Sequence, residues 1–97
     1  MLRPPSIQPK GFHRDIYLLL DDLGYGRIWR ETADREAVIQ CLLAGEFSDP
    51  ICIVAFNTVE GWSRDVTMDI ADEVRRRYVE MDDVPDSVLQ FTEANRR

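Results

Sequence analysis

The sequence predicts an α+β domain: a three-stranded mixed sheet with two or three helices, in the order ββαβαα. Two short apolar runs, at residues 15–20 and 51–56, have the length and composition of buried strands. Over residues 64–81, apolar side chains recur every three or four positions, as on one face of a helix. The helical segment between the second and third strands is long enough to be a crossover. It makes those two strands parallel and gives the strand order 2-1-3.

The first two strands follow an N-terminal arm. Residues 1–11 contain three prolines and few apolar groups, so we expect an extended or disordered arm, with a single domain over residues 12–97. Gly24 and Gly26 allow the chain to reverse after the first strand. Residues 27–31 alternate bulky and charged side chains, which is typical of a half-exposed edge strand that pairs with the first strand in a hairpin.

A helix is expected next, because Thr32 or Asp34 can accept hydrogen bonds from the free N–H groups of a first helical turn. Gly45 ends this helix, since glycine adopts a left-handed conformation at little cost. The apolar stripe of the helix comprises Ala37, Val38, Cys41 and Leu42. The run at residues 51–56 has β-branched residues at alternate positions and is therefore predicted to be the third strand.

The last two helices are predicted from periodicity and from a proline. The helix over residues 64–81 carries one apolar face, made of Val66, Ile70, Val74, Tyr78 and Met81. Ser63 stands where an N-cap is required, and Asp65 complements the positive end of the helix dipole. Pro85 suits the first turn of a short final helix. The apolar face of the final helix is predicted to be Val88, Leu89 and Phe91.

The segment GWSRD raises the question of catalysis. Gly61 and Ser63 match the start of the nucleophile elbow G-x-S-x-G, which places a reactive serine between a strand and a helix. Asp65 replaces the second glycine, and the one histidine, His13, lies in the N-terminal segment, so no general base is positioned for the serine. We therefore interpret Ser63 as a helix cap. Arg64, with the N–H groups of the helix start, is kept as an alternative anion contact.

A second candidate site lies where the first strand ends, at Asp21 and Asp22. Paired carboxylates hold Mg²⁺ in many phosphoryl-transfer sites, but a solvated hairpin turn is the favoured interpretation. With the strand-helix-strand segment at residues 27–57, this pair resembles the receiver domains of response regulators. Asn57 replaces the phosphoacceptor aspartate, and no helix follows Asp22, so phosphotransfer is not expected. The alternative function, a small ligand- or phosphate-binding or enzymatic domain, would use Asp21, Asp22, Asn57, Ser63 and Arg64.

Composition narrows the classes of partner. Twelve Lys and Arg against 18 Asp and Glu give a net charge of −6, which argues against nucleic-acid binding. No apolar run approaches the roughly 18 residues of a membrane span, and no apolar secretion signal is present, so we expect no membrane partner and a cytoplasmic location. Cys41 and Cys52 form no CxxC pair and are interpreted as buried free thiols that react slowly. No metal site and no cofactor are expected.

The segments LLLDD, GRIWRET and VAFNTVEGWSRDVTMDIADE resemble a set of small stand-alone bacterial proteins of uncharacterised function. This resemblance covers most of residues 15–73 and implies a bacterial domain, without supplying an activity or site residues. Trp29 and Trp62 are candidates for partner contacts if either is exposed. The leading hypothesis is a small protein-interaction or regulatory module, rather than an enzyme, that binds a second copy of itself or another protein.

Self-association is predicted from the alternation of side chains in the strands. In residues 51–56, alternate side chains point to opposite faces of the sheet, so both faces carry apolar groups. The two longer helices can cover one of these faces. The other face then requires either the short helix after Pro85 or a second copy of the chain related by a two-fold axis, and we favour the second copy.

Overall fold

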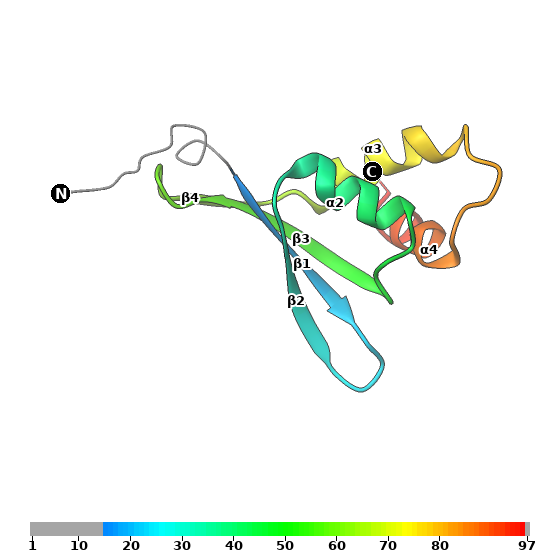
Figure 1. The fold of residues 1–97 in the computed structure, drawn as a ribbon, viewed down its shortest axis with the longest axis horizontal. Helices are drawn as coiled ribbons and strands as arrows, with labels where there is room; N and C mark the ends of the chain where they lie inside the picture. The colour runs from blue at the N-terminus through cyan, green and yellow to red at the C-terminus, as the bar shows by residue number, and fades with distance from the viewer. Residues whose placement is uncertain (1–14, 97) are drawn as a thin grey trace.

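The computed structural model describes residues 15–96, so the predictions about residues 1–11 and His13 lie outside the described residues. Figure 1 shows the fold. The elements are β1 (Ile16–Asp22), β2 (Arg27–Thr32), α2 (Arg35–Leu43), β3 (Pro50–Asn57), β4 (Trp62–Asp65), α3 (Thr67–Tyr78) and α4 (Asp86–Ala94). The α+β class is confirmed. The observed order is ββαββαα, so the prediction of three strands was wrong by one.

The four strands form one antiparallel sheet in the order β2-β1-β3-β4. The predicted order 2-1-3 is contained in it, because β1 pairs antiparallel with both β2 and β3. The prediction of a mixed sheet was wrong, because all three pairs of neighbouring strands are antiparallel. The additional strand, β4, pairs antiparallel with the last half of β3, where Asn57 lies opposite Trp62. A turn holding Gly61 at a φ of 76° joins them. This hairpin converts the predicted start of a helix into an edge strand.

The start of α3 corrects the prediction that Ser63 caps the helix. Ser63 lies in β4 opposite Phe56, and α3 begins only at Thr67. The N-cap residue is Val66, which makes no side-chain capping bond. The helix start is held by Asp65, whose Oδ1 accepts from the Thr67 N–H at 2.8 Å and from the Thr67 hydroxyl at 2.5 Å. The same hydroxyl oxygen accepts from the N–H of Ile53, at 2.9 Å. Asp65 and Thr67 therefore anchor the helix start to the middle of β3.

The other two helices are close to their predicted positions. Asp34 caps α2, since its Oδ1 accepts from the N–H of Ala37 at 2.8 Å, and Gly45 follows the helix at a φ of 73°. In α2 the buried residues are Val38, Ile39 and Leu42. In α4 they are Val88, Phe91 and Thr92. Leu89, which we expected on the buried face of α4, is 42% exposed because it lies about 100° around the helix from the buried Val88.

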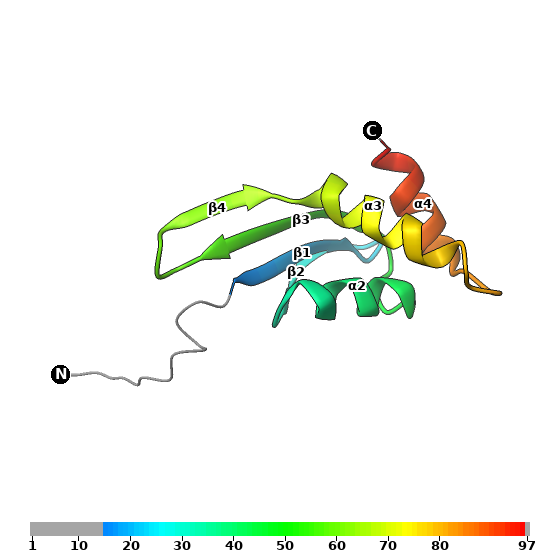
Figure 2. The ribbon, with the colours of Figure 1, turned by 90° about the horizontal axis from the view of Figure 1, so that it is seen from above.

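All three helices lie on the same side of the sheet (Figure 1). From above, α2 runs beside β1 and β2, while α3 and α4 lie together at the end of β3 (Figure 2). Their side chains share one core with alternate residues of the strands. This core contains Tyr17, Leu19, Val38, Ile39, Leu42, Phe47, Ile53, Ala55, Val66, Ile70, Ala71, Val74, Val88 and Phe91. The short helix α4 thus joins the core on the covered side, and no helix of residues 15–96 lies on the other face of the sheet.

An arginine joins α2 to α3 across the covered side. Arg77 donates to Glu36 of α2 at 2.7 Å and to Glu73 of its own helix at 2.6 Å. Hydrogen bonds from Arg77 lower the pKa of the Glu36 carboxyl to about 2. The described part of the chain contains no helix long and apolar enough to cross a membrane.

Candidate functional site

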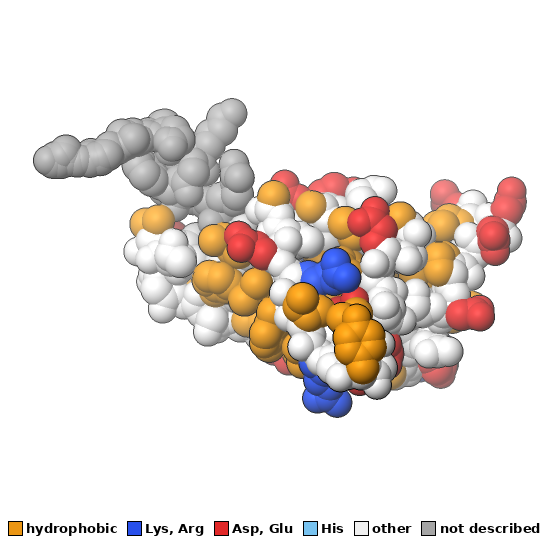
Figure 3. Space-filling view, turned by 60° about the horizontal axis from the view of Figure 1, so that its bottom comes forward, with side chains coloured by type: hydrophobic (Ala, Val, Ile, Leu, Met, Phe, Trp, Pro, Cys, Tyr) orange, Lys and Arg blue, Asp and Glu red, His pale blue; other side chains and the backbone are white. Residues whose placement is uncertain are grey.

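The sheet face turned away from the helices is the first candidate for function. Because neighbouring side chains of a strand point to opposite faces, Tyr17, Leu19 and Asp21 are buried under the helices, whereas the residues between them are only partly buried. The same alternation holds along β3. We call this surface the open face; its apolar residues are Ile16, Leu18, Leu20, Trp29, Cys52, Val54 and Phe56. With the underside turned forward, hydrophobic side chains gather over the strands (Figure 3).

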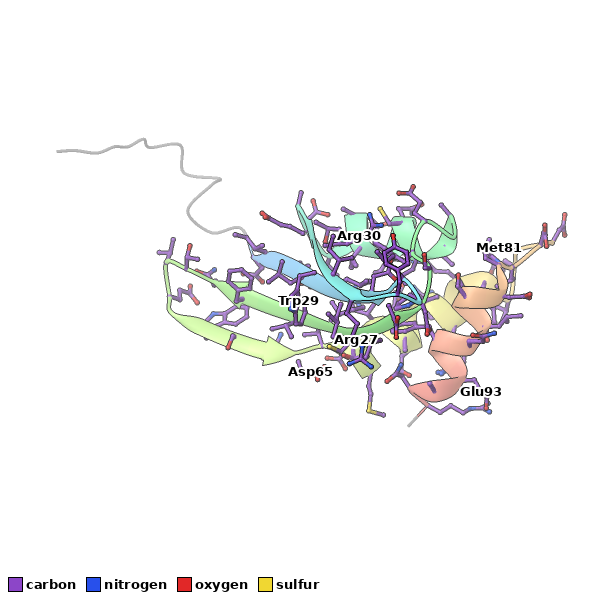
Figure 4. The ribbon with its side chains drawn as sticks, turned by 90° about the horizontal axis from the view of Figure 1, so that it is seen from below. Arg27, Trp29, Arg30, Asp65, Met81 and Glu93 are labelled. Atoms are coloured by element: carbon purple, nitrogen blue, oxygen red, sulfur yellow. The ribbon has the colours of Figure 1, made fainter. Side chains whose placement is uncertain are left out.

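Trp29 is the most prominent residue of the open face. It lies opposite Leu20 in the ladder between β2 and β1, and it is 50% exposed. Trp29 and Arg27 lie over the underside of the strands, whereas Arg30 lies toward α2 (Figure 4). Glu31 follows on the same side as Trp29, opposite Leu18. An exposed tryptophan on an apolar surface is a typical anchor for a protein contact.

The two aspartates at the end of β1 have separate structural roles. Asp21 is fully buried, and its carboxylate accepts from the N–H groups of Ser48 and Asp49, at 3.1 and 2.7 Å. The Nε of Arg30 lies 3.4 Å from the same carboxylate and forms an ion pair with it. Asp22 points the other way and accepts from the N–H of Gly24 at 2.9 Å. Asp21 therefore fixes the loop before β3, and Asp22 fixes the hairpin turn.

Asn57 stabilises a turn at the opposite end of the sheet. It is buried, donates to the carboxylate of Asp15 at 3.0 Å, and accepts from the N–H groups of Val59 and Glu60 at 2.9 and 2.8 Å. Asp21 pairs with Pro50, which stands seven residues before Asn57 in β3. At about 3.3 Å per residue, Asn57 lies about 23 Å from the aspartates. Asn57 and the aspartate pair cannot hold one small ligand together.

The remaining candidates, Ser63, Arg64 and Trp62, come from β4. Ser63 shares the open side of the sheet with Phe56, whereas Arg64 and Trp62 point to the covered side. Trp62 packs against the core, donates to Glu60 at 2.9 Å, and has the Arg64 guanidinium over its ring at 5.5 Å. The five residues of the predicted ligand site are thus distributed over both faces and both ends of the sheet.

The two cysteines are free thiols, but neither is as buried as we expected, because both are only half-buried. Burial still raises the pKa of each thiol above its usual value. Cys52 belongs to the open face, and Cys41 lies on α2 against the core. Within residues 15–96, no group of three or more His, Cys, Asp or Glu side chains is arranged to hold a metal ion.

Comparison with known proteins gives no relative from which a function could be inferred. No protein-family model, no curated protein and no solved structure matches the chain.

Proposed function

We propose that this protein is a protein-interaction module that self-associates through its open face. The observation that carries the proposal is the one-sided placement of the helices. A four-stranded sheet with seven apolar side chains on its uncovered face, one of them a half-exposed tryptophan, presents the kind of surface that protein contacts bury. The scattered positions of Asp21, Asp22, Asn57, Ser63 and Arg64 favour this module over the alternative ligand-binding or enzymatic domain.

A second copy of the chain is the occupant that the charges on β2 favour. On the open side this strand presents Arg27, Trp29 and Glu31 in succession. Arg27 has one weak ion pair, with Asp22 at 3.6 Å, and its side chain is 62% exposed. Glu31 has no ion pair among residues 15–96. The two charges stand four residues apart, about 13 Å along the strand, so they cannot pair within one chain.

A two-fold axis at Trp29, perpendicular to the strands, brings the opposite charges of two copies together. It reverses the strand direction, so that Arg27 of one copy faces Glu31 of the partner copy, and the reverse contact forms at the other end. Trp29 meets its own symmetry mate, and Leu20 and Cys52 lie in the same row. Two apolar faces packed in this way form a sandwich of sheets about 10 Å apart. In this arrangement, opposite charges meet at both ends of the contact, and the two apolar faces meet between them.

Multi-angle light scattering of the full chain at micromolar concentration is the first test. We expect a mass near twice the 11.3 kDa of one chain, falling on dilution. A mass that stays at 11.3 kDa on concentrating would remove self-association from the proposal and leave the open face to a different protein.

Charge reversal tests the two-fold arrangement itself. Glu31→Arg places two positive charges together at both ends of the interface, and Arg27→Glu places two negative charges there. Each variant should dissociate at a protein concentration that is about tenfold or more higher than for wild type. Mixed in equal amounts, the two variants should form a heterodimer, because every contact is then between opposite charges. Glu80→Arg, the same charge change at an exposed position beyond α3, is the matched control and should leave the dimer intact.

A thiol reagent provides an independent measurement. Cys52 lies on the open face, so dimerisation should slow its labelling relative to the monomeric Glu31→Arg variant, whereas the rate at Cys41 should be the same in both. A dimer in which Cys52 reacts as fast as in that variant would place the interface elsewhere on the molecule.

A further inference from the structure

Two arginines differ from all the other arginines in residues 15–96. Six of the eight form ion pairs with carboxylates; these are Arg27, Arg30, Arg75, Arg76, Arg77 and Arg96. Arg35 and Arg64 form none within this part of the chain. In a protein whose acidic residues outnumber its basic ones by six, unpaired arginines are unexpected. They come from different elements, the first residue of α2 and the edge strand β4.

Both unpaired arginines line the same hollow on the covered side of the molecule. This hollow has a volume of about 380 Å³. Its lining comes from β1, from the start of α2, from β4 and from α3, and it includes Tyr17, Arg35, Arg64, Ile70 and Arg76. Arg64 stands two strands from Tyr17 in one row of the sheet, since Tyr17 faces Ala55 and Ala55 faces Arg64. The hollow is thus separate from the open face.

The third member of this group is the hydroxyl of Tyr17. The residue is 8% exposed, and its hydroxyl has no hydrogen-bond partner among the described residues. Burial raises the pKa of the phenol above its usual value, and the charge of Asp15 adds to this, while Arg35 and Arg64 act in the opposite direction. The hydroxyl therefore carries its proton at neutral pH and is available as a donor. A buried polar group without a partner is unfavourable, which makes it a sign of a missing acceptor.

We propose that this hollow binds a small molecule through a carboxylate or phosphate group, held by Arg35 and Arg64 and hydrogen-bonded by the Tyr17 hydroxyl. Guanidinium groups present several N–H donors in a plane that matches such oxyanions. Tyr17 supplies one further donor from the sheet. All three side chains line one cavity, and a single oxyanion of a ligand can accept from each of them.

The carboxylates of α3 restrict the class of ligand. Asp69, Asp72 and Glu73 line the side of the hollow formed by that helix, where Glu73 pairs with Arg76. Their negative charge opposes ligands that carry many charges, such as nucleic acids or polyphosphates. A small ligand with a single oxyanion satisfies the two arginines and brings less negative charge into the hollow.

Titration of the ¹⁵N-labelled full chain with inorganic phosphate, and separately with acetate, tests the proposal. The amide signals of residues 17, 35 and 64 and the side-chain signals of the two arginines should shift together and saturate. We expect a dissociation constant of about 1 mM or tighter for at least one anion. The two titrations distinguish a phosphate site from a carboxylate site. Arg35→Gln combined with Arg64→Gln should weaken binding about tenfold or more. Arg96→Gln, which removes an exposed arginine of the C-terminal end, is the matched control and should bind as wild type does.

Tyr17→Phe separates a binding role from a structural one. Because the hydroxyl has no partner in the described structure, its removal should leave the unfolding midpoint unchanged or higher while weakening anion binding several-fold. Shifts that do not saturate, or that are the same in the double arginine variant, would overturn the proposal. So would a Tyr17→Phe variant that is less stable than wild type in anion-free buffer, since the hydroxyl would then have a structural partner.

Discussion

The two faces of the sheet differ far more in burial than in composition. Leu19 and Leu18 are neighbours in β1, yet Leu19 is fully buried under the helices and Leu18 is partly exposed on the open face. Asp21 and Asp22 repeat the contrast at the end of the same strand. What separates the faces is chain connectivity, because α2, α3 and α4 all pack on the same side. Residue type alone therefore does not determine which apolar face becomes the core.

This contrast also separates the residues that hold the fold from those that contribute less to it. Residues on the covered face are held by core packing and by buried hydrogen bonds, so their identity is explained by stability. Leu18, Leu20, Val54 and Phe56 contribute less to the stability of a single chain because they stay partly exposed. Their remaining exposed surface is what a partner on the open face, as proposed above, would bury.

The largest difference between the faces is expected for the two leucines. Leu19→Ala should lower the free energy of unfolding by about 4 kcal/mol, because it opens a cavity in a packed core. Leu18→Ala should lower it by about 1 kcal/mol in the monomeric Glu31→Arg background, where the open face is in water. Urea denaturation of both variants in that background measures the two values. Equal losses would mean that the open face is packed within one chain, and the distinction between the faces would fail.

A smaller difference is expected for the two aspartates. Asp21→Ala removes the acceptor of two backbone N–H groups and the partner of Arg30, so we expect a loss of about 3 kcal/mol. Asp22→Ala removes one turn hydrogen bond and an exposed ion pair, for which about 0.5 kcal/mol is expected. Thermal unfolding of the two variants provides the comparison. If Asp22→Ala were the more damaging change, the hairpin turn, and not the loop before β3, would be the critical contact.

Much of the fold could be predicted because its signals are local. The apolar runs gave β1 and β3, Asp34 and Gly45 marked the ends of α2, and the crossover gave the strand order 2-1-3. The strand β4 was missed because it has four residues and contains a single apolar side chain, Trp62. Its extended form depends on hydrogen bonding to β3, which is a tertiary contact that no local pattern records.

The candidate sites were harder to predict, for the same reason. Trp29 could be named from the sequence, but its exposure depends on which side the helices take. Arg64 was considered as an anion contact at a helix start, whereas it lies in β4 and shares its hollow with Arg35 and Tyr17. That these two arginines form no ion pair within residues 15–96 becomes visible only when pairs such as Arg77 and Glu36, 41 residues apart, are assigned. Ion pairing over such separations is set by the fold.

The smallest effect concerns β4 and sharpens the comparison of the faces. Ser63 and Asp65 share the open side of this strand, but Asp65 also accepts a hydrogen bond from the start of α3. Asp65→Ala should cost about 1 kcal/mol, the usual loss for a helix cap, while Ser63→Ala should stay within about 0.5 kcal/mol of wild type. Urea denaturation at one protein concentration, in the Glu31→Arg background, keeps dimerisation out of the measurement. A loss at Ser63 as large as that at Asp65 would contradict the role of Asp65 in holding the start of α3. It would show that α3 begins before Thr67 in solution, and that residues 62–65 leave the sheet.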